Sequence, residues 1–389
     1  MMLVDLRENR GTEQVFLNLI KYKPEDTQIG VVIPNISYYN RIETKDLEKR
    51  LQGISLISAS LPQDYYSRPK ISWPLHHLLS DRRYSKQNTE LKIKLKEFDV
   101  LYLFYNRHST LFERIPPILV GSEHTMPVTG LFSGNLVRRI ISFILNKRYF
   151  DKLIGIHIFP SEEPYKEKII KRLGIKHVFS LPNGIDLDLF NPTLNEEPHL
   201  KNQFKIFFVA SLEYSKGFDI FLDVANIMNG YRNVEFHVVG VGPMAEKIAS
   251  FNNITYHRFV TDQQLSALYK TMDIFLYPTR SDSFPLVVLQ ALASGLLILT
   301  SKNLSNVFHE FNNISIEFLG NEPNEYAAFL KEILENPQKL DFDKKACFDL
   351  IKAKYDWKQI ASDFYKQIEL IYASEVKTSM AGNNEIKES

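Results

Sequence analysis

Two segments in the second half of the sequence combine residue types and spacing suited to binding a phosphate-containing ligand. Lys216 and Gly217 follow a short apolar run at 205–210, and a second run leads into a loop that holds Asp282. A lysine at the carboxyl end of a parallel strand is well placed to neutralise phosphate. An ordinary surface lysine beside a glycine is the alternative interpretation.

The segment at 277–295, YPTRSDSFPLVVLQALASG, predicts a loop that leads into a helix. Pro285 stands where the first helical turn would begin, a position that tolerates its missing N–H. The free N–H groups of that turn and the helix dipole favour an anion. We therefore expect phosphate at the helix start, and Gln290, further along, at another part of the same ligand. The residues expected at the helix start are Ser283, Phe284, Pro285 and Leu286. A polar loop in an ordinary α/β unit is the alternative.

A glycine pair, Gly240 and Gly242, follows another expected strand end. The pair lacks the third glycine of a dinucleotide-binding loop, so by itself it is a weak signal. These glycines either let a ligand approach the backbone closely or simply turn the chain.

Short apolar runs that alternate with helical patterns indicate parallel βαβ units buried on both faces. The polar turn around 181–203 is the expected linker, so the prediction is two doubly wound, Rossmann-like domains: 1–190 and 191–355, then an amphipathic helix at 356–373 and a disordered tail at 374–389. The expected strands are 2–6, 29–33, 100–104, 118–120, 153–158, 205–210, 234–239, 273–277 and 296–300, and the expected helices are 11–22, 218–228, 261–271 and 286–294.

Composition excludes several classes of protein. The 389 residues are 44% hydrophobic and 24% charged, as in a globular protein, and the net charge of +1 argues against a nucleic-acid binder. Cys347 is the single cysteine, so no intrachain disulfide can form. The first residues contain acidic side chains rather than a signal-peptide core, and no run is long enough to span a membrane. We therefore expect a cytoplasmic protein.

Five segments in matching order resemble the retaining glycosyltransferases of the GT-B fold, in particular glycosyltransferase family 4 (glycosyl transferases group 1). The segments are Leu181-Pro-Asn-Gly-Ile-Asp186, Ala210-Ser211-Leu212 with Lys216-Gly217, Gly240-Val-Gly-Pro243, Asp282 to Gly295, and Trp357 with Tyr372. The resemblance covers nearly the whole chain and is strongest from Leu181 to Ser301. The resemblance implies two Rossmann-like domains facing each other across a cleft, with a C-terminal helix that crosses back to the first domain.

The resemblance also implies a reaction: transfer of a hexose from a nucleoside diphosphate sugar to an acceptor hydroxyl with retention of configuration. Lys216 and the N–H groups around Phe284 and Leu286 would stabilise the leaving diphosphate, without an obligatory metal or other cofactor. Asp282 would bind sugar hydroxyls and Gln290 the ribose.

In the first domain, Gly11 resembles part of the family's loop near the diphosphate and acceptor. His124 resembles the histidine beside the transferred sugar, and we favour it over His108 on the preceding strand end. The alternative for either is a structural histidine.

The sequence departs from the family pattern at several positions. Ser211 replaces an arginine, Asp282 shortens a glutamate, and Gln290 removes the charge of a second glutamate. Serine cannot replace the bidentate phosphate contact of arginine. Arg258, beside Phe259 at the expected base-binding strand end, is a candidate for the missing positive charge. These changes indicate either an unusual donor or a second hypothesis, a catalytically inactive GT-B partner or scaffold protein. A GT-B epimerase is a less favoured third hypothesis, because it would need acidic and histidine catalytic groups in the first domain that we do not identify.

One indication of the acceptor is a segment at 136–148 with a basic, apolar pattern. Arg138, Arg139, Lys147 and Arg148 surround its apolar side. Such a helix can lie on an anionic bilayer, which suits a lipid-linked or glycan acceptor at the inner face of the membrane. A helix packed on the sheet with solvated charges is the alternative, and we favour it. Aromatic residues concentrated within 36–79 fit either an acceptor groove or loop packing.

Overall fold

The computed structural model describes residues 2–3, 10–34, 51, 54–59, 93–104, 118–122, 147, 150–160, 170, 172–192, 203–312 and 314–388. The chain divides into two compact units. Unit 1 comprises 1–182 and 358–389, and unit 2 comprises 183–357. The first boundary therefore precedes the residue 190 expected from the sequence, because the turn from Asn183 to Asp186 already belongs to unit 2.

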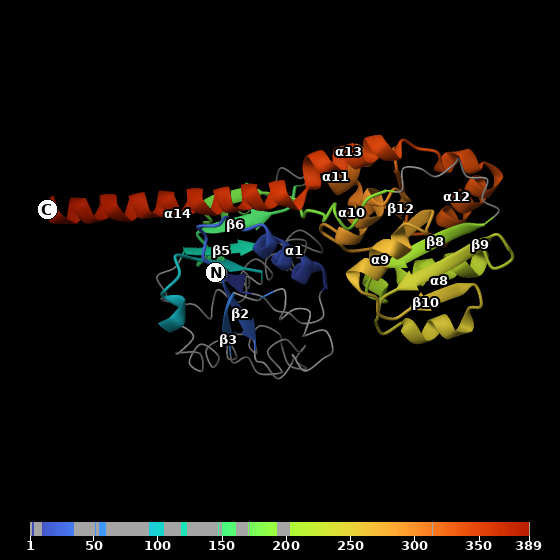
Figure 1. Cartoon of the computed structure of the whole chain (residues 1–389), viewed down its shortest axis with the longest axis horizontal. Coiled ribbons are helices and arrows are strands. Elements are labelled where there is room, and N and C mark those ends of the chain that lie inside the picture. The colour runs from blue at the N-terminus through green and yellow to red at the C-terminus, as the bar shows by residue number, and fades with distance from the viewer. Residues whose placement is uncertain are drawn as a thin grey trace. The chain divides into compact units, whose positions relative to one another are not determined.

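Unit 1 is built on a parallel sheet (Figure 1). The strands are β1 (Met2–Leu3), β2 (Gly30–Pro34), β3 (Ser55–Ala59), β4 (Val100–Leu103), β5 (Ile118–Ser122), β6 (Gly155–Ile158) and β7 (His177–Ser180). Their order among the described residues is β3-β2-β1-β4-β5-β6-β7, and every adjacent pair is parallel. The strand order reverses between β1 and β4, which is where ligands of such sheets bind.

Two helices pack on each other in unit 1. They are α1 (Arg10–Lys21) and the long α14 (Trp357–Glu388), whose Tyr365 hydroxyl donates to the carbonyl of Leu19 at 2.8 Å. Phe364 of α14 packs edge-on against Tyr102 of β4, with ring centroids 4.9 Å apart. The return of the C-terminal helix to the first unit is thus confirmed.

The chain from 374 onward differs from the sequence-based expectation. It continues α14 to Glu388 instead of forming a disordered tail. Residues 374–388 contain no proline and several good helix formers. Extending an existing helix avoids the cost of nucleation, which explains why a weakly periodic polar segment stays helical.

Unit 2 repeats the architecture with a second parallel sheet, ordered β10-β9-β8-β11-β12-β13 among the described residues. The strands are β8 (Phe204–Val209), β9 (Val234–Val239), β10 (Ile254–His257), β11 (Ile274–Tyr277), β12 (Leu297–Ser301) and β13 (Ile316–Leu319). The helices are α8 (Phe218–Ile227), α9 (Asp262–Tyr269), α10 (Leu286–Ala293), α11 (Ser305–Phe308), α12 (Pro323–Glu335) and α13 (Lys344–Tyr355), with a short 3-10 turn, η5 (Tyr214–Lys216), after β8.

Alternate residues of β8 explain why helices cover both faces of this sheet. Phe208 packs against Phe218 and Phe221 of α8, whereas the adjacent Phe207 packs against Tyr269 of α9. Successive side chains of a strand point to opposite faces. A strand with apolar side chains on both faces, such as β8, is therefore buried on both sides, as the sequence predicted.

The described residues include no helix that combines the length and the apolar character needed to cross a bilayer.

Candidate functional site

Unit 2 brings Lys216 and Asp282 together at the point where its strand order reverses. From β8 the chain moves outward through β9 and β10, and from β11 it moves the other way through β12 and β13. Open parallel sheets bind ligands at the carboxyl ends of the strands that flank such a reversal. Lys216 follows β8 and Asp282 follows β11, which is the neighbour of β8.

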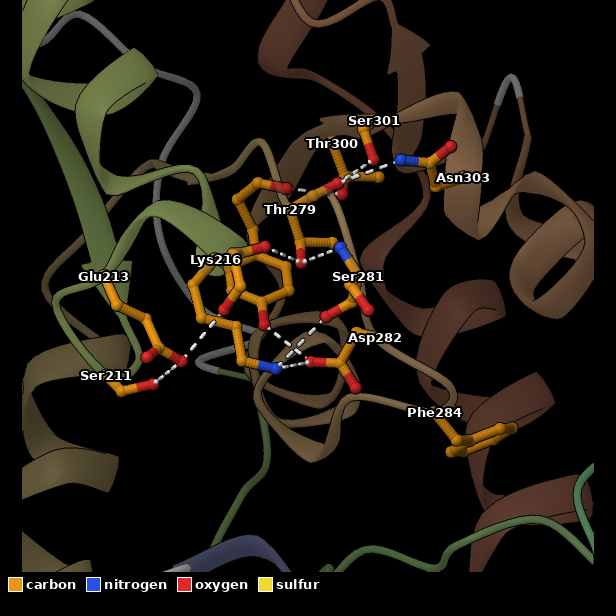
Figure 2. Close-up of polar contacts among 12 residues, drawn as sticks. Ser211, Glu213, Lys216, Thr279, Ser281, Asp282, Phe284, Thr300, Ser301 and Asn303 are labelled. Atoms are coloured by element: carbon orange, nitrogen blue, oxygen red, sulfur yellow. Dashed lines mark hydrogen bonds and ion pairs between the residues drawn. The ribbon is translucent and has the colours of Figure 1, made fainter. Parts of the chain in front are cut away.

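The two side chains form an ion pair, with Lys216 Nζ 2.6 Å from Asp282 Oδ2 (Figure 2). The same carboxylate oxygen accepts a hydrogen bond from the Tyr277 hydroxyl at 2.8 Å. Burial, together with the charge of Asp282, raises the pKa of Tyr277 well above its ordinary value, so its hydroxyl remains a donor. The lysine and aspartate side chains keep 24% and 18% of their surface exposed, which leaves the pair within reach of a ligand.

Ser211 lies beside the lysine loop and is held by an acidic neighbour. Its hydroxyl donates to Glu213 Oε1 at 3.0 Å, and the Ser215 hydroxyl donates to the same oxygen at 2.9 Å. Where the family pattern has an arginine, this chain therefore has a serine bonded to a carboxylate. Lys216 is left as the cation closest in sequence to this position.

One carbonyl oxygen of η5 binds the backbone of the loop after β11. The carbonyl of Ser215 accepts hydrogen bonds from the backbone N–H of Arg280 at 2.9 Å and of Ser281 at 3.2 Å. Gly217 follows at φ 73°, and a side chain there would overlap the carbonyl oxygen of Pro278. Only glycine allows this close approach of the two loops.

The end of β12 and the turn that follows it support the same loop with polar side chains (Figure 2). Ser301 Oγ donates to the carbonyl of Thr279 at 2.5 Å, and Asn303 Nδ2 donates to the carbonyls of Thr279 and Arg280, both at 3.3 Å. Thr300 Oγ1 donates to the carbonyl of Tyr277 at 2.6 Å. These three side chains therefore hold the backbone of the loop that carries Asp282.

The expected helix start is present: α10 begins at Leu286, with Pro285 at its N-cap. The first N–H groups of a helix have no partner within it, so this turn can accept an anion. The carbonyl of Phe284 accepts a hydrogen bond at 3.2 Å from Asn183 Nδ2, which is buried. Ser283, between Asp282 and Phe284, is half-buried. Asn183 was predicted only as a turn residue, and its contact with the loop was missed.

Gln290 lies further along α10 and is bonded inside unit 2. Its Oε1 accepts a hydrogen bond from the Tyr269 hydroxyl at 3.3 Å, and this hydroxyl also donates to the carbonyl of Val287 at 3.2 Å. The amide thus has a fixed orientation before any ligand binds.

Gly240 and Gly242 lie where the loop after β9 approaches the loop after β8. At Gly240, φ is 147°, and a side chain would overlap the carbonyl oxygen of Ala210; at Gly242 it would overlap the backbone of Leu212. Both glycines therefore let two loops approach each other, which supports the turn interpretation made from the sequence. Arg258 lies over the ring of Phe259 at 5.4 Å, just after β10, and the ring is 58% exposed.

Several residues proposed from the sequence fall outside the described residues: His108, His124, Arg138, Arg139, Arg148 and most of 36–79. Gly11 is described only as part of the first turn of α1. Lys147 is described and is exposed in an ion pair with Asp151 at 2.7 Å. The part of the chain that the structure describes contains no group of three or more His, Cys, Asp or Glu side chains able to hold a metal ion.

Comparison with known families gives one match: residues 203–336 match the model described as glycosyl transferases group 1. Among curated proteins, the chain is 24% identical over 229 residues to a phosphatidylinositol N-acetylglucosaminyltransferase subunit of Arabidopsis thaliana, a match over 55% of this chain and 48% of that protein. It is 22% identical over 176 residues to D-inositol 3-phosphate glycosyltransferase of Paenarthrobacter aurescens, over 40% of this chain and 43% of that protein. The matches thus span less than half the length of these relatives.

Solved structures resemble the chain over almost its full length. Sucrose-phosphate synthase from Thermosynechococcus elongatus has a TM-score of 0.71 at 13% identity, covering 96% of this chain and 98% of that one. Anabaena HepE, solved in complex with UDP and glucose, has a TM-score of 0.68 at 14% identity, covering 95% of this chain and 98% of that one. At this identity the likeness shows the fold alone, and it is the two-domain Rossmann-like fold predicted from the sequence.

Proposed function

Because the chain has the GT-B fold and its residues 203–336 belong to the glycosyl transferases group 1 family, we propose that it is a glycosyltransferase. It transfers a hexose from a nucleoside diphosphate sugar to an acceptor hydroxyl, with retention of the anomeric configuration. The observation that carries this proposal is the placement of Lys216 and Asp282 together at the β8/β11 reversal, 2.6 Å apart and partly exposed.

Negative charge develops on the leaving diphosphate during such a transfer. In the proposal, Lys216 and the N–H groups at the start of α10 stabilise this charge, and no metal ion is assigned to the step. Asp282 accepts hydrogen bonds from sugar hydroxyls, and Gln290 contacts the ribose. Arg258 and Phe259, at the end of β10, are assigned to the base, and His124 to the transferred sugar.

Uridine diphosphate is the first nucleotide to test, since HepE was solved with UDP and with UDP-glucose. A glycan or a lipid-linked molecule is the proposed acceptor. Some relatives are named for work on phosphatidylinositol or inositol phosphate. Contact of the basic segment at 136–148 with the inner face of a membrane is the less favoured part of this proposal, since we prefer a helix packed on the sheet for that segment.

The second candidate function is that of a non-catalytic partner protein in a larger assembly. Two relatives, from Arabidopsis thaliana and Schizosaccharomyces pombe, are named as subunits of a phosphatidylinositol N-acetylglucosaminyltransferase. The bond between Ser211 and Glu213 also favours this alternative, because it places a carboxylate where the family pattern has a cation.

Thermal unfolding in the presence of UDP-, GDP- and ADP-sugars decides between the two candidates. A donor present at 100 times its Kd stabilises the folded protein by about 2.7 kcal/mol, which is readily detected. An enzyme shows a shift with at least one donor, and Lys216→Ala reduces it. The absence of any shift at millimolar concentrations would exclude the enzyme. Where a donor binds, the anomeric configuration of the product tests retention directly.

A further inference from the structure

Arg280 lies between the two elements of the site and has no role in the proposed chemistry. Its Nη1 is 2.6 Å from Asp219 Oδ1 and its Nη2 is 2.8 Å from Asp219 Oδ2, so both ends of the guanidinium bind one carboxylate. Asp219 lies in the first turn of α8, directly after the lysine loop. Such a bidentate pair fixes orientation as well as distance.

Three further contacts join Arg280 to η5. Nη1 also donates to the carbonyl of Tyr214 at 2.8 Å, and the guanidinium lies 3.8 Å from the centroid of the Tyr214 ring. The backbone N–H of Arg280 donates to the carbonyl of Ser215. Side chain and backbone of one residue are thus attached to the turn that ends at Lys216.

These contacts have a direct consequence for the ion pair. Arg280 is separated from Asp282 by one residue, and Tyr214 is separated from Lys216 by one residue. The distance between the lysine and the aspartate therefore depends on how firmly Arg280 holds the two loops together. Misplacement of a substrate-positioning group by an ångström is enough to slow catalysis strongly.

A direct role in phosphate binding is the competing explanation, because Ser211 has replaced the family arginine. The geometry opposes it. Both Nη atoms of Arg280 already bind Asp219, and the hydrogen bond to Asp219 raises the pKa of Arg280. Binding a phosphate would require the guanidinium to leave this carboxylate and the Tyr214 ring.

We propose that Arg280 and Asp219 are positioning residues. They keep Lys216 and Asp282 at the distance from each other that the donor requires, and neither of them contacts the donor. The identity of the ligand rests on the function proposed above, whereas the positioning itself does not.

The direction in which Asp219→Asn changes the affinity for UDP separates positioning from direct phosphate binding. If Arg280 positions the loops, Asp219→Asn and Arg280→Ala each weaken UDP binding and lower kcat by about tenfold, and the double variant is little worse than either, as for residues that act through one contact. If Arg280 binds phosphate, Asp219→Asn frees the guanidinium and tightens UDP binding, which would overturn the inference. Calorimetric titration with UDP measures the affinity, and steady-state transfer kinetics measures kcat.

Arg280→Lys adds a conservative variant. Lysine keeps the charge but loses the fork and the planar contact with the ring. We expect it to behave like Arg280→Ala. Recovery of wild-type UDP affinity by lysine would contradict positioning, because a point charge suffices for phosphate but not for the bidentate bond.

Hydrogen exchange of the Arg280 and Ser281 amides, which donate to Ser215, provides a reading that needs no nucleotide. We expect exchange about tenfold faster at 278–285 in Asp219→Asn, the size of coupling seen between charged residues in contact. Lys345→Ala, which breaks an exposed pair on α13, serves as the control and should leave these amides unchanged. Faster exchange in a protein that binds no nucleotide would refute the proposed function and leave the positioning intact. Unchanged exchange would refute the positioning.

Discussion

A tyrosine hydroxyl bonded to a titratable side chain occurs in each unit, in very different surroundings. In unit 1, Tyr102 of β4 binds Nδ1 of His157 of β6 at 2.7 Å, and both residues are almost fully buried. In unit 2, Tyr277 binds Asp282 at 2.8 Å, and the carboxylate also pairs with Lys216. The second cluster is charged and partly exposed, whereas the first is neither.

In the buried cluster of Tyr102 and His157, both ring nitrogens of the histidine have hydrogen-bond partners within unit 1. His157 Nε2 lies 2.9 Å from the carbonyl of Leu181 and the ring stacks on Phe179, so the imidazole donates through Nε2 and accepts from Tyr102 through Nδ1. Burial lowers the pKa of His157 to about 4 and keeps the ring neutral. A cluster whose polar atoms are all bonded internally stabilises the fold, while one that keeps charge at the surface can still bind a ligand.

The largest effect expected from this contrast is on transfer activity in Lys216→Ala. Removing the cation leaves the leaving diphosphate without its main side-chain partner, and loss of one such group lowers kcat by about 10²- to 10³-fold. Steady-state kinetics with the donor identified by thermal shift measures it.

The matched control is Lys345→Ala. Lys345 also lies 2.6 Å from an aspartate, Asp349, but the two side chains are 72% and 57% exposed on α13. Its loss should leave both activity and stability nearly unchanged, as for most surface pairs. Equal activity of Lys216→Ala and Lys345→Ala would mean that the cluster in unit 2 does not serve catalysis.

The second largest effect concerns the stability of the buried cluster as a function of pH. His157 has a pKa of about 4 in the folded protein and about 6.5 when unfolded. Between these values the unfolded chain binds a proton that the folded chain does not, so stability is full above pH 6.5 and falls as the pH is lowered towards 4. The difference is about 3 kcal/mol.

Urea unfolding from pH 7 to pH 4 measures this loss. In the variant Tyr102→Phe/His157→Phe, both partners become apolar, and this part of the pH dependence should disappear. A variant that keeps the full slope would show that other groups cause it.

The third effect is that Asp282→Asn raises the affinity for UDP and lowers the rate of transfer. Asp282→Asn removes the carboxylate that competes with phosphate for Lys216 while keeping the shape of the side chain. We expect UDP to bind about five- to tenfold more tightly, the scale of one charge-assisted hydrogen bond, and transfer to become slower because the sugar loses its acceptor. Calorimetry with UDP and kinetics with the donor test both parts. Weaker UDP binding would show that Asp282 does not compete for the lysine.

How much of the fold is visible in the sequence depends on the position of each strand in its sheet. Runs such as those of β8, β9, β11 and β12 were predicted closely, because central strands buried on both faces are mostly apolar. The strands missed were β3, β7 and β13, three of the four edges of the two sheets as described, and the fourth edge, β10, was indicated only by the strand end expected at Phe259. An edge strand such as β10 is only half-buried and carries polar residues, so its pattern is weak.

The residues of the candidate site also fall into two groups, those that the sequence predicted and those that it did not. Lys216, Asp282 and the start of α10 follow from local order along the chain, since each comes directly after a recognisable strand. The roles of Glu213, Asn183 and Asn303, and the bond between Arg280 and Asp219, were not predicted. The contacts of Asn183, Asn303 and Arg280 join loops far apart in sequence, and only the folded structure brings them together. Glu213 binds serines two residues away on either side, a local contact that the motif comparison did not indicate.

The smallest effect is expected from Gln290→Glu, which restores the charge of the family pattern without changing side-chain size. Its Oε1 already accepts from the buried Tyr269 hydroxyl, whose pKa is raised well above its ordinary value by burial, so the new carboxylate keeps this donor and its orientation. A carboxylate is also a stronger acceptor for a ribose hydroxyl than an amide oxygen. We therefore expect the affinity for UDP to rise by about two- to fivefold, with little change for inorganic diphosphate, which has no ribose. Gln338→Glu, on the 3-10 turn Pro337–Leu340, is the control for a general effect of added charge. If wild type and Gln290→Glu bind UDP equally well, residue 290 does not contact the nucleotide. The ligand-binding residues of unit 2 would then extend along α10 no further than its first turn.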